Sequence, residues 1–258
     1  MLVFIGLGLH GEGISLRGLR EAQGADAIYA EFYTSLIPGV DAKRLEQKIG
    51  KPIKIVGREV VEGNPEEILE AARKGKVAFL VPGDPMVATT HIDLRLRAAK
   101  AGIATKIIHG ASIASAAAGL AGLQSYKFGP SATVPFPDNP SARPYEILVE
   151  NRGRGLHTLL LLDIRTEEGR AMTANEAIEI MAGLEKKLQK NAFTLDTLAV
   201  VVARAGSEDA MVRADCIEKL ANLDFGSPPH VLIVPGKLHF VEAEALRVFA
   251  GALRDVVG

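Results

Sequence analysis

Short apolar runs alternate along the first half of the chain with segments whose apolar residues recur at the spacing of one helix face. The runs are bounded by Gly, Pro or Asp, and such continuous runs are typical of strands buried on both faces of a mainly parallel sheet. The segment 64–67 (Asn-Pro-Glu-Glu), followed by apolar residues at helical spacing, predicts a capped crossover helix. We therefore predict an α/β domain over residues 1–112, with strands at 2–7, 27–33, 53–56, 77–81 and 103–108.

A second α/β domain is predicted over residues 113–258, because the pattern changes after the small residues at 111–122. Residues 125–137 are expected to be extended, and strands are predicted at 156–162, 198–203 and 231–234. Thr173 with Glu176 three residues later forms a capping box, which predicts the start of the longest helix in this domain. An amphipathic helix at 241–257 is expected to close the domain.

Composition narrows the possible classes of protein. The 30 Lys and Arg residues against 31 Asp and Glu residues give a formal net charge of -1, which disfavours binding of nucleic acid through bulk phosphate neutralisation. Cys216 is the single cysteine of the sequence, which excludes an internal disulfide and a multi-cysteine metal site. No apolar stretch approaches the roughly 18 residues of a membrane span. We expect a cytoplasmic protein with no membrane partner and no nucleic-acid partner.

The first loop carries a glycine pattern that is also found in dinucleotide-binding proteins. Gly6, Gly8 and Gly11 spell GxGxxG between a predicted strand and a predicted helix, and Glu31 ends the second strand. The same glycines suit a plain strand-to-helix turn or the close approach of another ligand. An NAD-dependent oxidoreductase is therefore one alternative at this point.

A second pattern has the chain order of an α/β-hydrolase triad. Ser112 lies between a predicted strand and a predicted helix, Asp163 follows a later strand, and His230 comes further on. A nucleophile elbow requires glycine on both sides of the serine, and Ala114 stands where the second glycine would be. The simpler interpretation of Ser112 is that it caps the helix predicted at 114–120.

The six histidines show no spacing of the kind that metal ligands have on one helix, so no metal site is predicted. Asp84, in the segment Val-Pro-Gly-Asp-Pro at 81–85, has the ordinary interpretation of a turn aspartate that accepts hydrogen bonds from nearby amides. It also stands at the carboxyl end of a predicted strand, where open α/β sheets bind ligands.

Several loops of this kind follow or enter predicted strands, and some belong to each predicted domain. They lie at 6–9, 83–91, 110–113, 158–164, 203–206 and 228–230. Their distribution over the chain predicts that they meet in a cleft between the domains.

The motif in one of these loops and two motifs elsewhere in the chain resemble those of the diphthine synthase family, within the tetrapyrrole-methylase-like class of S-adenosylmethionine methyltransferases. The resemblance rests on Gly-Asp-Pro-Met-Val-Ala-Thr-Thr-His at 83–91, on Met-Thr-Ala-Asn-Glu-Ala at 172–177 and on Pro-Gly-Lys-Leu-His at 235–239. It extends from the first strand nearly to the end of the chain. A corrin or ribosomal-RNA methyltransferase of the same class is the alternative within the family.

The resemblance implies two α/β domains with S-adenosylmethionine in the cleft between them, and a homodimer. It implies methylation of the 3-amino-3-carboxypropyl arm of a modified histidine on translation elongation factor 2. Eight residues are implied as cofactor contacts: Leu9, Asp84, Val87, Ser112, Ile113, Leu162, Ala205 and His230.

The chemistry of such a reaction requires few titrating side chains. A sulfonium carries its own activation, so the protein must mainly align the nucleophile, the methyl group and the leaving sulfur. Asp84 is a candidate partner for polar or cationic parts of the cofactor, and Gly8, Gly83 and Gly206 would let the backbone approach it. An amine acceptor must lose a proton before it attacks, and the sequence alone names no residue for that role.

Overall fold

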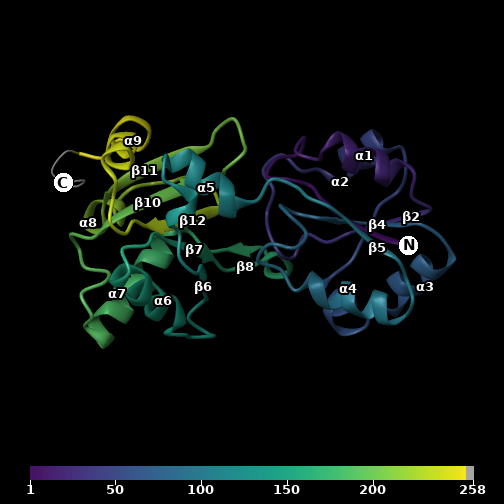
Figure 1. Cartoon of the computed structure of the whole chain (residues 1–258), viewed down its shortest axis with the longest axis horizontal. Helices are drawn as coiled ribbons and strands as arrows, with labels where there is room; N and C mark the ends of the chain where they lie inside the picture. Colours follow the sequence, from purple (N-terminus) through teal and green to yellow (C-terminus); the bar gives the residue numbers. More distant parts are fainter. Residues whose placement is uncertain (254–258) are drawn as a thin grey trace. The chain divides into compact units, whose positions relative to one another are not determined.

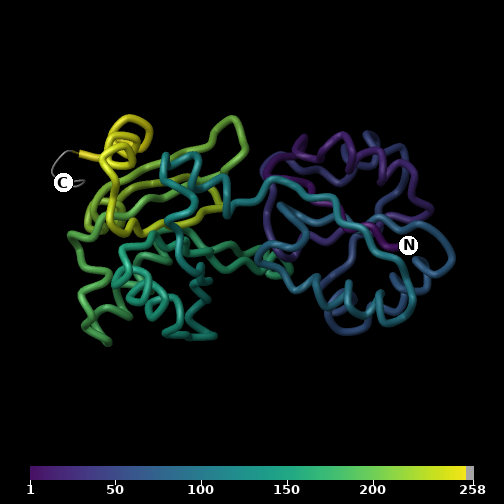
Figure 2. Tube along the Cα trace, in the orientation of Figure 1, coloured from purple at the N-terminus to yellow at the C-terminus, as the bar shows by residue number. Residues whose placement is uncertain are grey.

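The computed structural model describes residues 1–253, and the chain divides into two compact units. Unit 1 comprises Met1–Ile113 together with Arg165–Gly169, and unit 2 comprises Ala114–Ile164 and the chain from Arg170 onward. The sequence placed the boundary after residue 112 and assigned 165–169 to the second domain. Figure 2 follows the chain from unit 1 into unit 2, which begins at Ala114.

Unit 1 is built on a five-stranded parallel sheet, as the buried apolar runs predicted. Its strand order is β3-β2-β4-β1-β5. The strands are β1 (Leu2–Gly6), β2 (Ala27–Ala30), β3 (Lys54–Ile55), β4 (Val77–Val81) and β5 (Thr105–Ile108). Every residue of β1 and β4 is buried, because both strands lie inside the sheet and both of its faces are covered.

Helices cover the two faces of this sheet (Figure 1). The helices are α1 (Leu16–Gln23), α2 (Ala42–Ile49), α3 (Glu66–Lys74) and α4 (His91–Lys100), with a π-helical turn η1 (Glu59–Gly63). Phe4 and Phe79 of the sheet pack with Leu94 of α4 on one face. Ile5 and Leu45 belong to the core on the other face. Successive side chains along each strand point to opposite faces of the sheet, so they pack into two separate cores.

Unit 2 contains a mixed five-stranded sheet with the order β11-β10-β12-β7-β6. The strands are β6 (Ala132–Val134), β7 (Thr158–Leu162), β10 (Leu198–Ala203), β11 (Met211–Cys216) and β12 (His230–Val234). The β6–β7 pair is parallel and the other three pairs are antiparallel. A short hairpin joins β8 (Ile164–Arg165) to β9 (Arg170–Ala171) through the turn η3 (Thr166–Glu168), and its segment Arg165–Gly169 belongs to unit 1. The edge strand β11 was not expected from the sequence.

The helices of unit 2 lie on both sides of its sheet, with α5 and α9 opposite α6 and α7 (Figure 1). They are α5 (Ile113–Ala121), α6 (Arg143–Gly153), α7 (Ala174–Leu188), α8 (Ile217–Leu220) and α9 (Phe240–Ala250), with a 3-10 turn η2 (Ser125–Lys127). No helix within residues 1–253 is long and apolar enough to cross a membrane.

Two predicted helix ends can be compared with the structure. The capping box is present, since Glu176 N–H donates to the Thr173 hydroxyl and the Glu176 carboxylate accepts from Thr173 N–H. The helix predicted at 241–257 is shorter than expected, because Gly251 adopts a left-handed conformation (φ +72°) that ends α9 at Ala250. Residues 254–257 of that prediction lie outside the described residues.

Candidate functional site

Two backbone turns meet at the carboxyl edge of the unit 1 sheet. Gly8 N–H donates to the Gly83 oxygen at 3.1 Å, and Gly83 N–H donates to the Gly8 oxygen at 2.9 Å. Both glycines have positive φ, +72° for Gly8 and +67° for Gly83, a conformation that side-chain-bearing residues rarely adopt. This bridge joins the loop after β1 to the loop after β4.

The loop after β5 packs backbone to backbone against the same point. A Cβ atom on Gly110 would lie 2.4 Å from the Gly83 oxygen, and one on Gly6 would lie 2.6 Å from the Gly110 nitrogen. Only glycine fits at Gly6 and Gly110 without displacement of the backbone. The strand order explains the meeting, because β1 lies between β4 and β5 and their carboxyl ends share one edge.

Asp84 connects the loops after β4 and β5 through its side chain. It is 6% exposed. Oδ1 accepts from Met86 N–H at 2.9 Å, and Oδ2 accepts from Gly110 N–H at 3.3 Å. Oδ2 also lies 2.8 Å from Nδ1 of His109. Asp84 therefore accepts a hydrogen bond within its own turn, from Met86 N–H, as the turn interpretation predicted. Its carboxylate also holds the loop after β5 through Gly110 and His109.

The other residues expected as cofactor contacts in unit 1 lie on the same three loops. Leu9 lies in the turn after β1. Val87 lies three residues after Asp84 and is 40% exposed. Ser112 and Ile113 are half-buried at the start of α5. Gly83 offers room for close approach, because a Cβ atom there would meet only the Ala111 oxygen, at 3.9 Å. The structure thus brings together the five unit 1 residues of the expected set.

The three expected residues of unit 2 also share one edge, that of their own sheet. Ala205 follows the end of β10, where Ala203 pairs with His230 at the start of β12. Leu162 ends β7, and β7 pairs with β12 through Leu161 and Val231. Leu162, Ala205 and His230 are each at most 6% exposed.

The imidazole of His230 is engaged on both nitrogens inside unit 2. Nδ1 accepts from Ala174 N–H at 3.1 Å, at the start of α7, and Nε2 lies 3.1 Å from the Ser227 oxygen. Because a carbonyl only accepts, Nε2 carries the hydrogen, and burial lowers the pKa of the ring below its ordinary value. Nδ1 uses its lone pair to accept from Ala174 N–H, and Nε2 carries a hydrogen, so neither nitrogen is free to take a proton from a serine. His230 therefore cannot serve as the base of a serine hydrolase, and the triad hypothesis is wrong.

Arg204 is a buried arginine that organises the loops around His230, and the sequence did not single it out. It has a positive φ of 49° and is 8% exposed. Its guanidinium donates to the Asp209 carboxylate at 2.6 Å and to the Ser227 oxygen at 2.9 Å. A left-handed backbone outside glycine indicates a position that its surroundings hold in place.

The NAD hypothesis fails on topology and on the role of Glu31. In a dinucleotide-binding unit the first two strands are neighbours, whereas here β4 separates β2 from β1. Glu31 is fully buried, and its carboxylate accepts from the Tyr33 and Thr34 amides at 3.0 Å and from the Thr34 hydroxyl at 2.5 Å. It is therefore not available to bind a ribose.

Glu31 instead takes part in a buried pair with His91, the first residue of α4. Nε2 of His91 lies 3.6 Å from Oε1 of Glu31, and Nδ1 donates to the Pro85 oxygen at 3.3 Å. Burial raises the pKa of Glu31 to about 7 and lowers the pKa of His91. Pro85 is the residue after Asp84, so the hydrogen bond from His91 to the Pro85 oxygen helps to hold the expected cofactor loop in place.

A second buried carboxylate, Glu242, anchors the Pro-Gly-Lys-Leu-His segment at 235–239 in unit 2. It accepts from Gln124 N–H at 2.9 Å and from His239 N–H at 2.8 Å, and it pairs with Lys127 and His157. Although burial opposes ionisation, these partners hold the pKa of Glu242 down at about 2. The interactions tie the start of α9 to the turn η2, which gives this segment a structural role.

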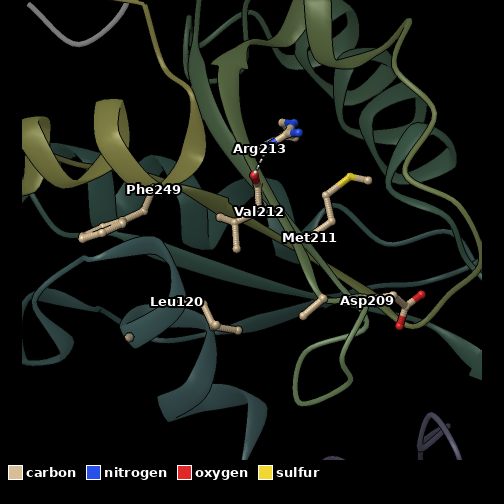
Figure 3. Close-up of a pocket in the computed structure, with 8 residues that line it drawn as sticks. Leu120, Asp209, Met211, Val212, Arg213 and Phe249 are labelled. Carbon is tan, nitrogen blue, oxygen red and sulfur yellow. Dashed lines mark hydrogen bonds between the residues drawn. The ribbon is translucent and has the colours of Figure 1, made fainter.

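Unit 2 also carries an open groove of about 580 Å³ that sequence analysis did not predict (Figure 3). Leu120, Met211, Val212 and Phe249 supply most of its apolar lining. Nearby apolar side chains of α9 are exposed, including Val248 at 64% and Phe249 itself at 65%. Within residues 1–253, no cluster of three or more His, Cys, Asp or Glu side chains is arranged to hold a metal ion.

Comparison with known proteins identifies the family of this chain. Residues 1–221 match the family model of tetrapyrrole (corrin/porphyrin) methylases. A diphthine synthase of Methanosarcina acetivorans is 50% identical over 254 residues, covering 95% of this chain and 94% of that protein. One of Methanocella arvoryzae is also 50% identical, covering 97% of this chain and 98% of that protein. A crystal structure of diphthine synthase superposes with a TM-score of 0.91 at 41% identity, covering 99% of this chain and 98% of the other. The chain belongs to the tetrapyrrole (corrin/porphyrin) methylase family.

Proposed function

We propose that this protein is a diphthine synthase that uses S-adenosylmethionine. It transfers methyl groups to the 3-amino-3-carboxypropyl arm of a modified histidine on translation elongation factor 2. The observation that carries the proposal is the full-length similarity to diphthine synthases at 50% identity. The protein acts in the cytoplasm, where translation elongation takes place.

The residues expected from the sequence are the proposed contacts of the cofactor. In unit 1 they are Leu9, Asp84, Val87, Ser112 and Ile113, and in unit 2 they are Leu162, Ala205 and His230. When bound, S-adenosylmethionine supplies a methyl group that its sulfonium has already activated.

The unit 1 loops fit such a ligand in two respects. The free side of Gly83 admits a ligand atom close to the backbone, and the exposed side chain of Val87 offers an apolar contact. The buried ring of His230 is held by Ala174 and Ser227, so we expect the cofactor to meet the backbone of this residue. The protein's own task is to hold these loops in place and to align the acceptor with the methyl group.

A corrin or ribosomal-RNA methyltransferase of the same family is the second candidate. The net charge of -1 disfavours an RNA substrate. The similarity to diphthine synthases over nearly the whole chain favours the elongation factor over a corrin.

The decisive experiment supplies methyl-labelled S-adenosylmethionine and elongation factor 2 that carries the unmethylated 3-amino-3-carboxypropyl histidine. Mass spectrometry of the histidine peptide should show label on that residue, and the mass increment gives the number of methyl groups. Elongation factor 2 without the arm is the matched control. Binding of NAD without any response to S-adenosylhomocysteine in calorimetry would refute the methyltransferase assignment.

We also propose that the enzyme is a homodimer of two 27.4 kDa chains. The groove of Figure 3 and the exposed apolar side of α9 support self-association, because soluble monomers rarely expose contiguous apolar surface of this kind. Light scattering should give twice the chain mass, and Phe249→Glu should shift it toward the monomer. Leu195→Glu changes a residue that is 60% exposed and does not line the groove, so it should leave the dimer intact. A wild-type monomer with full activity would refute the dimer.

A further inference from the structure

His109 lies outside the expected cofactor set, yet the structure places it in contact with Asp84 of the loop after β4. It follows β5 directly, and its side chain is 73% exposed. Its Nδ1 atom nevertheless lies 2.8 Å from Oδ2 of Asp84, which is 6% exposed. An exposed imidazole is thus fixed at one end by a buried carboxylate.

This contact determines which nitrogen of the ring carries the hydrogen. A carboxylate only accepts, so Nδ1 donates, and in the neutral ring Nε2 keeps its lone pair. Asp84 cannot turn away from the ring easily, because Met86 N–H and Gly110 N–H hold its two oxygens at 2.9 and 3.3 Å. The remaining nitrogen is therefore an oriented proton acceptor on the exposed end of the ring.

Asp84 is the charged group in contact with the ring. The loop after β4 contributes that carboxylate, and Gly6 at the end of β1 packs against Gly110, the residue after His109. Of these groups, only Asp84 is charged. An imidazole is the side chain that most often serves as a general base in enzymes.

We propose that His109 is the general base of amine methylation and that Asp84 is its positioning residue. This inference rests on the proposed function, in which the acceptor is the amine of the 3-amino-3-carboxypropyl arm. The substrate ammonium gives one proton to Nε2 of His109, and the nitrogen lone pair so freed attacks the methyl carbon. The nitrogen–carbon bond forms as the carbon–sulfur bond breaks, and the sulfur leaves as a neutral thioether with the bonding electron pair. His109 then releases the proton to water before the next transfer.

The alternative is that the Asp84–His109 contact only ties two loops together. The variant His109→Asn separates the two roles, because the asparagine amide can donate to Asp84 in place of Nδ1 but has no counterpart of Nε2. For this variant we expect an S-adenosylhomocysteine dissociation constant within about twofold of wild type and an unchanged melting temperature. We expect the rate of methyl transfer near neutral pH to fall by about 10²- to 10⁴-fold, the usual contribution of a general base.

Two further readouts respond to catalysis and not to loop structure. The rate of His109→Asn should recover toward that of wild type at alkaline pH, where water deprotonates the substrate amine. Added imidazole should restore part of the rate of His109→Ala. An unchanged rate and pH profile in His109→Asn would overturn the inference, as would a rate loss that persists at all pH values in parallel with lost cofactor affinity. A wild-type protein that transfers no methyl group would refute the proposed function itself.

Discussion

Removal of the Asp84 side chain tests whether the loops of unit 1 form the cofactor site. Asp84→Ala leaves the amides of Met86 and Gly110 without their acceptor and releases the ring of His109. Each lost backbone hydrogen bond should cost about 1 kcal/mol, and the contact to the exposed imidazole about 0–1 kcal/mol. The free energy of unfolding should therefore fall by about 2–3 kcal/mol. In a protein of this size that corresponds to a melting temperature about 4–12 °C lower.

The loss of cofactor affinity follows from the same contacts. Met86 precedes the proposed contact Val87, and Gly110 precedes Ser112, so both loops lose their common anchor. We expect the dissociation constant for S-adenosylhomocysteine to rise at least tenfold, which corresponds to about 1.4 kcal/mol. The measurement is isothermal calorimetry at a temperature well below the melting transition of the variant, alongside a thermal melt.

A matched control is Asp93→Ala in α4. Asp93 is exposed and pairs with Arg97 on the same helix at 2.7 Å, so its loss should cost roughly 1 kcal/mol or less and leave cofactor affinity unchanged. If Asp84→Ala melts at the wild-type temperature, the carboxylate does not hold the loops. If it melts lower and binds S-adenosylhomocysteine as tightly as wild type, these loops are not the cofactor site.

Three further predictions concern single side chains. Ser112 should remain unlabelled by a fluorophosphonate probe, because the ring of His230 is held by backbone groups; stoichiometric labelling would restore the hydrolase hypothesis. Burial raises the pKa of Glu31 from 4.5 to about 7, so the folded state binds a proton in this range that the unfolded state does not. Its contribution to stability is present below about pH 4.5 and is lost as the pH rises through about 7, by up to about 3 kcal/mol. Glu31→Gln should therefore show a smaller loss of stability between about pH 5 and 8 in denaturant titrations, and an identical pH dependence would refute this origin. Glu242→Ala should lower the free energy of unfolding by about 3–5 kcal/mol at neutral pH, because Lys127 loses its buried partner. Since the pKa of Glu242 is lowered to about 2, this deficit should shrink as the pH falls below about 4, and a constant deficit would contradict it.

Local sequence patterns were sufficient for those elements whose signals are local. The apolar run at 77–81 became β4 with the same bounds, because a strand buried on both faces needs only apolar side chains. The capping box at Thr173 placed the start of α7 correctly, since its two hydrogen bonds join residues three apart.

Local patterns failed to predict strands whose ends or existence depend on contacts with other residues. The second strand was predicted at 27–33 but ends at Ala30, because the carboxylate of Glu31 binds the next amides and turns the chain. Strand β11 was missed because Arg213 and Asp215 interrupt its apolar residues. This edge strand forms because its backbone pairs with β10. The residues of β11 alone do not indicate that pairing.

The amino-acid sequence by itself determined the α/β class, most strand positions, the absence of a disulfide and, through its motifs, the family resemblance and its implied cofactor residues. Only the tertiary structure decided how these residues meet. The sheet order places β1 between β4 and β5, so that three loops distant in the chain pack on one another through Gly6, Gly83 and Gly110. The contact between Asp84 and His109 joins residues 25 positions apart. No periodicity encodes such a contact, because it depends on which strands become neighbours, and that is settled by burial of the whole sheet and not by any one segment.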